Sequence, residues 1–428
     1  MNNKLLDFIN NSPTAFHTVE NIKKALINEG YEEIKEGRDW CLQRGKDYFV
    51  TRNDSSIIAF SIPKTDFNGF MIGCAHSDSP CFKLKSNSSF EDGLYVKLSC
   101  ERYGGMINST WLDRPLSVAG RVVVAAENGV SSLLVDVKKP VAVIPNVAIH
   151  LNKNANENTT YNAAVDLVPL YSCVGSETPS LLHSIAESLQ INTEDILSTD
   201  LFLYNSDIGV EWGDFVSAPR IDDLQCVFSA LNGFLTAKES GSMPVLAVFD
   251  NEEVGSSTKQ GADSNFLVSV LSKCISSVSG CIGNLTDYLA NSLMLSCDNG
   301  HAVHPNHPEL TDKNNSVMPN GGIVIKYNAN QKYCTDAVSA ALVKLLCKRA
   351  QVPFQEYSNR SDLPGGSTLG NIANTHASML TADIGLAQLA MHSAFETAGS
   401  KDTEYMSLFM SEFFSSSLKV NAEGFCLK

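Results

Sequence analysis

The chain has 428 residues, a length that exceeds the usual size of one hydrophobic core, so we expect two domains. Its composition, 43% hydrophobic and 18% charged, is typical of an ordinary globular protein. The formal net charge of -15 and the lack of basic patches argue against a nucleic-acid partner, because phosphate binding needs clustered Lys and Arg.

The sequence also predicts a cytoplasmic protein without a membrane partner. No run of about 18 apolar residues suggests a membrane span. The start, MNNKLLDFINNSP, lacks a basic region followed by an apolar core and is not typical of a secretory signal. The twelve cysteines are dispersed, contain no C-x-x-C and often lie in apolar runs, which favours reduced buried thiols over disulfides.

The first informative segment is FMIGCAH, residues 70–76, a short apolar run that predicts a buried strand ending at His76. Asp78 follows two residues later. In an extended segment residues i and i+2 point to the same side, so Asp78 can reach the imidazole of His76 and fix its tautomer.

The alternation of helix and strand patterns then ends, and residues 89–216 are rich in strand patterns. GLYVKLSCERYGG, SVAGRVVVAAENGVSSLLVDV and KKPVAVIPNVAIHL precede the helical pattern LLHSIAESLQ. This predicts a β-rich insertion at 89–216 between two parts of one domain, 1–88 and 217–428. His150 ends the third strand-like segment, and its residue pattern alone favours a histidine packed in a strand over a catalytic one.

After residue 216, strand and helix patterns alternate again. PVLAVFD, LMLSC and SMLTADIG are strand-like, and DLQCVFSALNGFLTAK and TDAVSAALVKLLCKRA have helical spacing. This alternation predicts an α/β fold with a mixed, mostly parallel sheet flanked by helices, in which ligands bind beyond the carboxyl ends of the strands. His76, Glu252, Glu253 and Asp298 fall at those ends.

Five metal-seeking side chains lie near the ends of these apolar runs: His76, Asp222, Glu253, Asp298 and His392. Two histidines and three carboxylates suit a pair of zinc ions when one carboxylate bridges them. Adjacent side chains in NEEV are expected to diverge, so Glu253 faces a metal and Glu252 faces the water, where it acts as general base. The sequence therefore predicts a hydrolase with two Zn(II) per subunit.

The motifs HSDSP, PRxD, DNEEVGS, D-x-GHAxHPN and AMHS, in this order, resemble those of the M18 family of metalloaminopeptidases, the aspartyl aminopeptidases. FINNSPTAFHTVE, YGGMINSTWLDRPLSVAGRV and PNVAIHLNK extend the likeness through nearly the whole chain. The resemblance implies the same five zinc ligands, with Asp222 as the bridge, Glu252 as general base and Asp78 supporting His76. One departure is Asp223, where the family commonly has Asn, and it adds negative charge near the metals.

The resemblance also implies a substrate and an assembly. The substrates would be peptides with an acidic N-terminal residue, whose carboxylate pairs with Lys326 in GGIVIKYNANQ. Without the resemblance, Lys326 is equally well explained as a lysine at a strand end that reaches solvent. The insertion would be a dimerisation domain, the dimers would build a dodecamer, and His150 would reach into a neighbour's active site.

Other residues and functions stay open. Gly366 and Ser367, in a Gly-rich turn, could contact substrate or form a plain surface turn. For three histidines a structural role is favoured over binding of a third metal: His301, His304 and His307.

Two alternative functions also remain. A zinc carboxypeptidase or deacylase would need a positive group for the substrate's α-carboxylate. A non-catalytic assembly or cargo scaffold is disfavoured because it has no use for Glu252.

Overall fold

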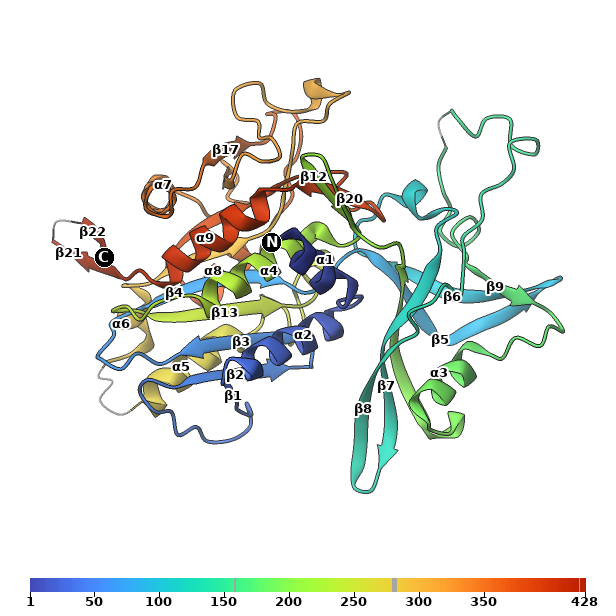
Figure 1. Ribbon diagram of the computed structural model, residues 1–428, viewed down its shortest axis with the longest axis horizontal. Helices are drawn as coiled ribbons and strands as arrows, with labels where there is room; N and C mark the ends of the chain where they lie inside the picture. Colours follow the sequence, from blue (N-terminus) through green and yellow to red (C-terminus); the bar gives the residue numbers. More distant parts are fainter. Residues whose placement is uncertain (158, 279–282, 423) are drawn as a thin grey trace.

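The computed structural model describes residues 1–157, 159–278, 283–422 and 424–428. Figure 1 shows a large body, in which helices flank a sheet, beside a second body built mainly of long strands. Strands of the first body come from both ends of the sequence, and the second body comes from its middle. The chain therefore leaves the first body, forms the second and returns.

The large body is built on a nine-stranded sheet. Five of its pairings are parallel and three are antiparallel. This confirms the α/β fold with a mixed, mostly parallel sheet. In spatial order the strands are β1 (Glu32–Glu33), β2 (Asp47–Arg52), β3 (Ser56–Ser61), β13 (Met243–Phe249), β4 (Phe70–His76), β14 (Leu293–Cys297), β18 (Leu380–Gly385), β16 (Ile323–Tyr327) and β17 (Phe354–Ser358).

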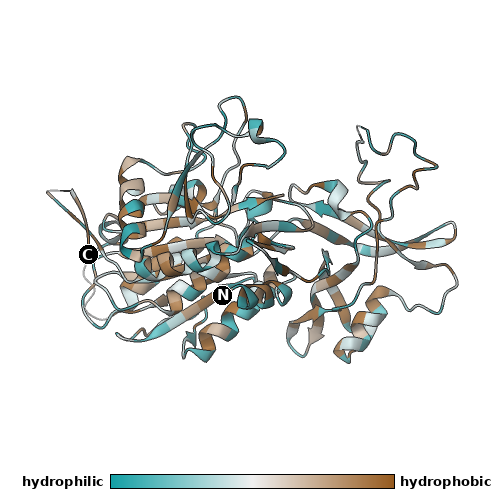
Figure 2. Cartoon of the chain, turned by 45° about the horizontal axis from the view of Figure 1, so that its top comes forward, coloured by the Kyte–Doolittle hydropathy of each residue, from teal (hydrophilic) through white to brown (hydrophobic). Residues whose placement is uncertain are grey.

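Helices cover both faces of this sheet because its strands are apolar on both sides. In β4, Met71 and Ala75 pack into the core on one face, whereas Ile72 and Cys74 pack into the core on the other. Figure 2 shows hydrophobic residues concentrated along these packed strands and helices. One face carries α2 (Ala15–Asn28), α4 (Ile221–Leu235), α7 (Ala337–Ala350) and α9 (Asp402–Phe414); the other carries α5 (Phe266–Ser277), α6 (Leu285–Leu289) and α8 (Leu369–His376).

The second body is an antiparallel six-stranded sheet with its own apolar core, and α3 (Leu181–Leu189) packs into that core. Its strands, in spatial order, are β8 (Gly129–Asp136), β7 (Leu116–Ala126), β10 (Ile196–Asn205), β5 (Cys81–Asp92), β6 (Tyr95–Tyr103) and β9 (Leu170–Cys173). The expected boundary at residue 89 falls inside β5, because that strand runs without a break from Cys81. The boundary at 216 falls inside β12 of another sheet. The division into domains stays a prediction.

A five-stranded sheet is built from short segments between residues 210 and 399. It contains β11 (Val210–Trp212), β12 (Phe215–Ala218), β20 (Glu396–Gly399), β19 (Ala387–Leu389) and β15 (Gly300–His301). The N-terminal helix α1 (Asn2–Asn10) packs against it together with the start of α4. The sequence patterns do not predict this sheet because its strands are very short. A two-stranded ribbon, β21 (Leu418–Asn421) and β22 (Gly424–Leu427), ends the chain.

Four short 3₁₀ helices lie in the connections of the described chain: η1 (Asn108–Trp111), η2 (Thr193–Asp195), η3 (Glu252–Val254) and η4 (Pro308–Leu310). Eleven of the twelve cysteines fall in the described residues, and no disulfide joins two of them, whereas Cys281 lies outside these residues. Among the described helices none is long and apolar enough to cross a membrane. The cytoplasmic location stays a prediction.

Candidate metal centre

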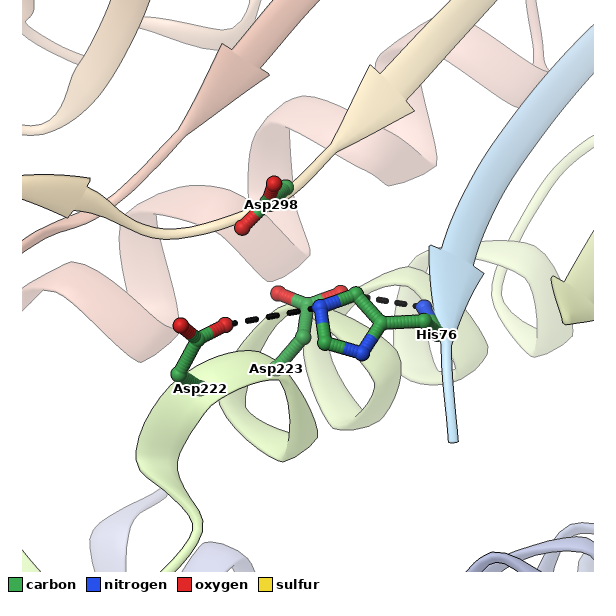
Figure 3. Close-up of side chains that lie close together, drawn as sticks. All are labelled: His76, Asp222, Asp223 and Asp298. Atoms are coloured by element: carbon green, nitrogen blue, oxygen red, sulfur yellow. Dashed lines mark hydrogen bonds and ion pairs between the residues drawn. The ribbon is translucent and has the colours of Figure 1, made fainter. Parts of the chain in front are cut away.

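The five candidate ligands come together from five different segments of the chain. His76 ends β4, Glu253 lies in η3 just after β13, and Asp298 follows β14. Asp222 lies at the start of α4, and His392 lies in the turn between β19 and β20. Because β4, β13 and β14 are parallel neighbours, their carboxyl ends meet at one edge of the sheet. Figure 3 shows Asp222, Asp298 and His76 directed toward one another at this edge.

Asp222 is shared by two groups of possible metal donors. One group contains His76, Asp222, Asp223 and Asp298, and another contains Asp222, Glu253 and His392; within each group the donor atoms lie within 4.8 Å of one another. The two carboxylate oxygens of Asp222 face different histidines. Oδ1 lies 3.5 Å from His76 Nε2, and Oδ2 lies 3.4 Å from His392 Nε2. This is the arrangement expected of a carboxylate that bridges two cations.

These distances suit ligands of one metal better than hydrogen-bonded partners. Two atoms that each lie about 2.0–2.1 Å from a tetrahedral zinc are about 3.3–3.4 Å apart, whereas an N–H···O hydrogen bond is about 2.9 Å long. His392 Nε2 also lies 3.5 Å from Glu253 Oε2. The separations among His76, Asp222, Glu253 and His392 therefore leave the space that a bound cation needs.

The other ring nitrogen of each histidine is held by an acceptor that fixes the tautomer. His392 Nδ1 donates to the Gly105 carbonyl oxygen at 2.7 Å. His76 Nδ1 donates to the Asp78 carbonyl oxygen at 3.1 Å, and the Asp78 carboxylate lies 3.5 Å away. A carbonyl only accepts hydrogen bonds, so both Nδ1 atoms carry protons and both Nε2 lone pairs face the centre. The Asp78 carboxylate lies near His76, as expected, but the hydrogen bond that fixes the His76 tautomer is accepted by the Asp78 backbone carbonyl.

The buried oxygens at this centre lack protein partners. Asp222 Oδ1, Asp223 Oδ1 and Glu253 Oε1 are buried and make no hydrogen bond among the described residues. An unpaired buried carboxylate oxygen is costly unless a cation or a proton compensates it. The donor set therefore fits a pair of metal ions. The His392 side chain is 30% exposed, so the centre opens to solvent on that side.

Glu252 and Glu253 lie in the single turn of η3, not in an extended segment. The expectation that their side chains diverge is wrong, because oxygens of both lie within 4.8 Å of each other and of a His76 nitrogen. Their backbone amides both donate to the Asp78 carboxylate, Glu252 N at 3.1 Å and Glu253 N at 3.2 Å. Asp78 therefore holds the turn as well as His76.

Without bound cations, the buried Glu252 carboxyl and its carboxylate neighbours favour the protonated form. Burial raises the pKa of its carboxyl to about 8; the nearby His76 opposes this shift, and the carboxylates of Asp298 and Asp78 add to it. This shift is typical of carboxyl groups at catalytic sites.

Asp223 belongs to the donor group of His76 but not to that of His392, so it does not take the position of a bridge. Its Oδ2 accepts a hydrogen bond from the backbone amide of His76 at 3.2 Å. Burial raises the pKa of its carboxyl well above the ordinary value, and the charge of Asp298 adds to this effect. Of the two adjacent aspartates, only Asp222 faces both His76 and His392 in the contacts between described residues.

Lys326 is buried in β16, so the alternative of a lysine that reaches solvent is wrong. Its Nζ donates to the Asn299 carbonyl oxygen at 2.8 Å and lies 3.8 Å from Asp298 Oδ2. Burial alone would lower the pKa of this ammonium, but the Asp298 carboxylate raises it above the ordinary value. Lys326 therefore places a permanent positive charge beside one of the candidate ligands.

Three other candidate residues are not brought to the centre within this chain. His150 lies in an exposed turn, so the interpretation of a packed strand histidine is wrong. Gly366 and Ser367 are exposed, and Ser367 Oγ donates to Asn371 Oδ1 at 3.0 Å. The three histidines that follow Asp298 belong to no group of metal donors among the described residues: His301, His304 and His307.

Sequence reasoning missed Glu396, a buried residue of β20. Its Oε2 accepts from the backbone amide of Asp222 at 3.0 Å, and its Oε1 accepts from the backbone amide of His392 at 2.6 Å. One carboxylate thus fixes the main chain of two candidate ligands that are far apart in sequence. Its position four residues after His392, in MHSAFE, is the only signal in the sequence that could have indicated it.

Comparisons with known proteins give a consistent result. The chain matches the family described as Aminopeptidase I zinc metalloprotease (M18) over residues 8–414. A Clostridium novyi (strain NT) protein named probable M18 family aminopeptidase 2 is 45% identical over 424 residues, 96% of this chain and 98% of that one. The fold is similar to a chain in the cryo-EM structure of the Ape4 and Nbr1 complex, with a TM-score of 0.92, 36% identity and coverage of 96% and 85%. It is also similar to a chain in the structure of the S. cerevisiae mApe1 dodecamer, with a TM-score of 0.85, 29% identity and coverage of 96% and 95%.

The geometry predicts which histidines are needed for metal binding. His76→Ala and His392→Ala each remove an Nε2 donor that faces Asp222, so both variants are expected to contain less zinc than the wild type by atomic absorption. His301→Ala is the matched control, because this histidine lies near Lys326 but outside the donor groups of the described chain. Full zinc content in either His76→Ala or His392→Ala would remove that residue from the ligand set.

Proposed function

Because the chain belongs to the M18 family of zinc metalloproteases, which are aminopeptidases, we propose that it is a di-zinc enzyme that removes N-terminal Asp and Glu residues from peptides. One observation carries the di-zinc part of this proposal. Two groups of donor atoms share Asp222, and each of its carboxylate oxygens faces a different histidine. A bridging carboxylate between two cations is the simplest account of that arrangement.

Each metal position would be held by its own side chains and by the shared carboxylate. His76 and Asp298 would hold one ion, and Glu253 and His392 would hold the other, with Asp222 between them. Bound zinc would supply Lewis acidity for the substrate carbonyl and would lower the pKa of a coordinated water. The remaining chemistry falls to the side chains around the centre.

Glu252 is proposed as the general base. Its carboxylate would take the proton of the attacking water and then pass it to the leaving amine of the cleaved peptide bond. Support comes from its place in η3 beside Glu253, with a carboxylate oxygen within 4.8 Å of donor atoms of His76 and Glu253. Asp78 would keep Glu252 in place through the backbone hydrogen bond at 3.1 Å.

Lys326 is proposed to select acidic substrates. An ammonium group has three donor protons. The hydrogen bond to Asn299 uses one and the Asp298 carboxylate attracts a second, which leaves one for the side-chain carboxylate of a substrate. A charge-assisted hydrogen bond in a buried position discriminates strongly against substrates that lack the acceptor. Gly366 and Ser367 stay proposed as substrate contacts on the resemblance alone.

The proposed active enzyme is a homo-oligomer built from dimers. Large apolar side chains are exposed over much of the six-stranded sheet and its loops, including Leu94, Val130, Val147, Ile149, Leu151 and Val165. Such a surface is typical of one that another protein chain covers. His150 lies between Ile149 and Leu151, so an interface over this loop would carry the imidazole to a neighbouring subunit. The S. cerevisiae mApe1 relative is a dodecamer, which supports the same assembly here.

The first prediction concerns the general base. Glu252→Gln keeps the shape of the side chain but cannot accept a proton, so we expect activity to fall about a hundred- to ten-thousand-fold. Zinc content measured by atomic absorption should equal that of the wild type, which separates loss of the base from loss of metal. Nearly normal turnover at normal zinc content would sink the assignment of Glu252.

The second prediction concerns substrate selection. Wild-type enzyme should cleave Asp- and Glu-anilides faster than Leu- and Ala-anilides and should not cleave N-blocked substrates. In Lys326→Met, hydrolysis of the acidic substrates should fall by about one to two decades relative to the neutral ones, because a charge-assisted bond is lost. Lys344→Met is the matched control: it removes a lysine that pairs with Glu356 away from the centre, and it should change the hydrolysis of neither the acidic nor the neutral substrates. An equal loss on acidic and neutral substrates would show that Lys326 serves stability.

The third prediction concerns the proposed shared active site. His150→Ala and Glu252→Gln should each be nearly inactive, yet activity should return when the two are unfolded, mixed and reassembled. A mixed dimer contains one subunit with its own Glu252 and a neighbour that supplies His150. His183→Ala changes another exposed histidine of the same region and should stay active by itself. Mixed assemblies verified by mass spectrometry but still inactive would rule out a role for His150 across the interface.

A further inference from the structure

The last residue of β6, Tyr103, connects the six-stranded sheet to the metal centre. Its hydroxyl donates to Asp78 Oδ2 at 2.7 Å and accepts from Asn251 Nδ2 at 2.7 Å. Its ring packs edge-on against Phe202 of β10, with 5.8 Å between the ring centroids. The ring is thus fixed by the six-stranded sheet, while the hydroxyl is bonded to two residues of the large body.

Asp78 is the point through which this contact reaches the candidate ligands. Its Oδ1 accepts from Glu252 N at 3.1 Å, its Oδ2 accepts from Glu253 N at 3.2 Å, and its backbone carbonyl accepts from His76 Nδ1 at 3.1 Å. The side chain is almost fully buried. A buried carboxylate that loses one of its donors has reason to rotate, and rotation of Asp78 would disturb the turn that carries the two glutamates.

The two glycines after Tyr103 place the same segment against the other side of the centre. The Gly105 carbonyl accepts from His392 Nδ1 at 2.7 Å. A Cβ atom at Gly104 would lie 3.2 Å from the Glu253 Cβ, and Gly104 has a φ of +76°, so a larger residue would be both crowded and strained. The segment from Tyr103 to Gly105 therefore bonds to Asp78 and His392 and passes close enough to Glu253 to leave no room for a side chain at Gly104.

We propose that Tyr103 is a positioning residue of the metal centre, whose hydroxyl holds the Asp78 carboxylate so that His76 and the turn carrying Glu252 and Glu253 keep their places. The six-stranded sheet would then have a role in metal affinity in addition to any role in assembly. This inference rests on the metal centre of the proposed function, but not on the identity of the substrate.

The test compares two Tyr→Phe variants of the same sheet. Tyr103→Phe removes the hydroxyl that bonds Asp78. Tyr204→Phe is the matched control, because its hydroxyl donates to the carboxylate of Asp136 at 2.7 Å, and Asp136 is not one of the candidate ligands or their partners. The readout is the zinc Kd of the full-length protein in competition with a chromophoric chelator. Loss of a residue that orients a metal ligand typically weakens affinity about 10- to 100-fold.

We expect that loss in Tyr103→Phe and a wild-type Kd in Tyr204→Phe, with equal melting temperatures for the metal-free forms of both. At saturating zinc, kcat should stay lower in Tyr103→Phe while KM changes little, because Glu252 is displaced. A wild-type zinc Kd in Tyr103→Phe would overturn the proposal. A melting temperature of metal-free Tyr103→Phe well below that of metal-free Tyr204→Phe would also overturn it, because the hydroxyl would then stabilise the fold as a whole. A wild type that binds zinc but cleaves no aminoacyl substrate would instead refute the proposed function alone.

Discussion

The structure depends most on a concentration of negative charge at one edge of the nine-stranded sheet. Asp222, Asp298 and Glu253 converge there, and Asp223 and Glu252 lie directly beside them. Carboxylates this close and this buried repel one another and lose hydration, which the apolar interior around them cannot replace. Two bound cations would remove this cost, and Lys326 already offsets part of it at Asp298. The same negative charge that destabilises the centre without metal would attract cations to it.

The rest of the fold keeps these side chains from relaxing apart. Parallel strands β4, β13 and β14 bring three of their ends together, and the apolar cores on both sheet faces hold those strands in place. Single acceptors then fix several backbone groups at once. Glu396 binds the amides of Asp222 and His392, and Asp78 binds those of Glu252 and Glu253. Glu396 therefore restrains two segments that are far apart in the sequence, and Asp78 restrains the η3 turn that carries both glutamates.

The six-stranded sheet is joined to this arrangement and is not a separate attachment. Tyr103 contacts Asp78, and Gly105 contacts His392, so the end of β6 reaches both sides of the centre. Exposed apolar side chains on the same sheet suggest a surface for other subunits. In the proposed oligomer this sheet would contact both the centre and a neighbouring subunit, which would give assembly a physical route to the active site.

The sequence by itself determined the alternation of strands and helices, the sheet class and the candidate ligands His76, Glu253 and Asp298. These properties are local, because apolar periodicity identifies a strand and a parallel strand places the next polar residue at the sheet edge. Tertiary structure decided the rest. The two Asp222 oxygens face different histidines, and Glu252 and Glu253 converge in a 3₁₀ turn. Glu396 and Tyr103 hold residues of the centre. These features depend on contacts between segments far apart in the chain. No local pattern records such contacts, because their geometry is set by how whole sheets pack together.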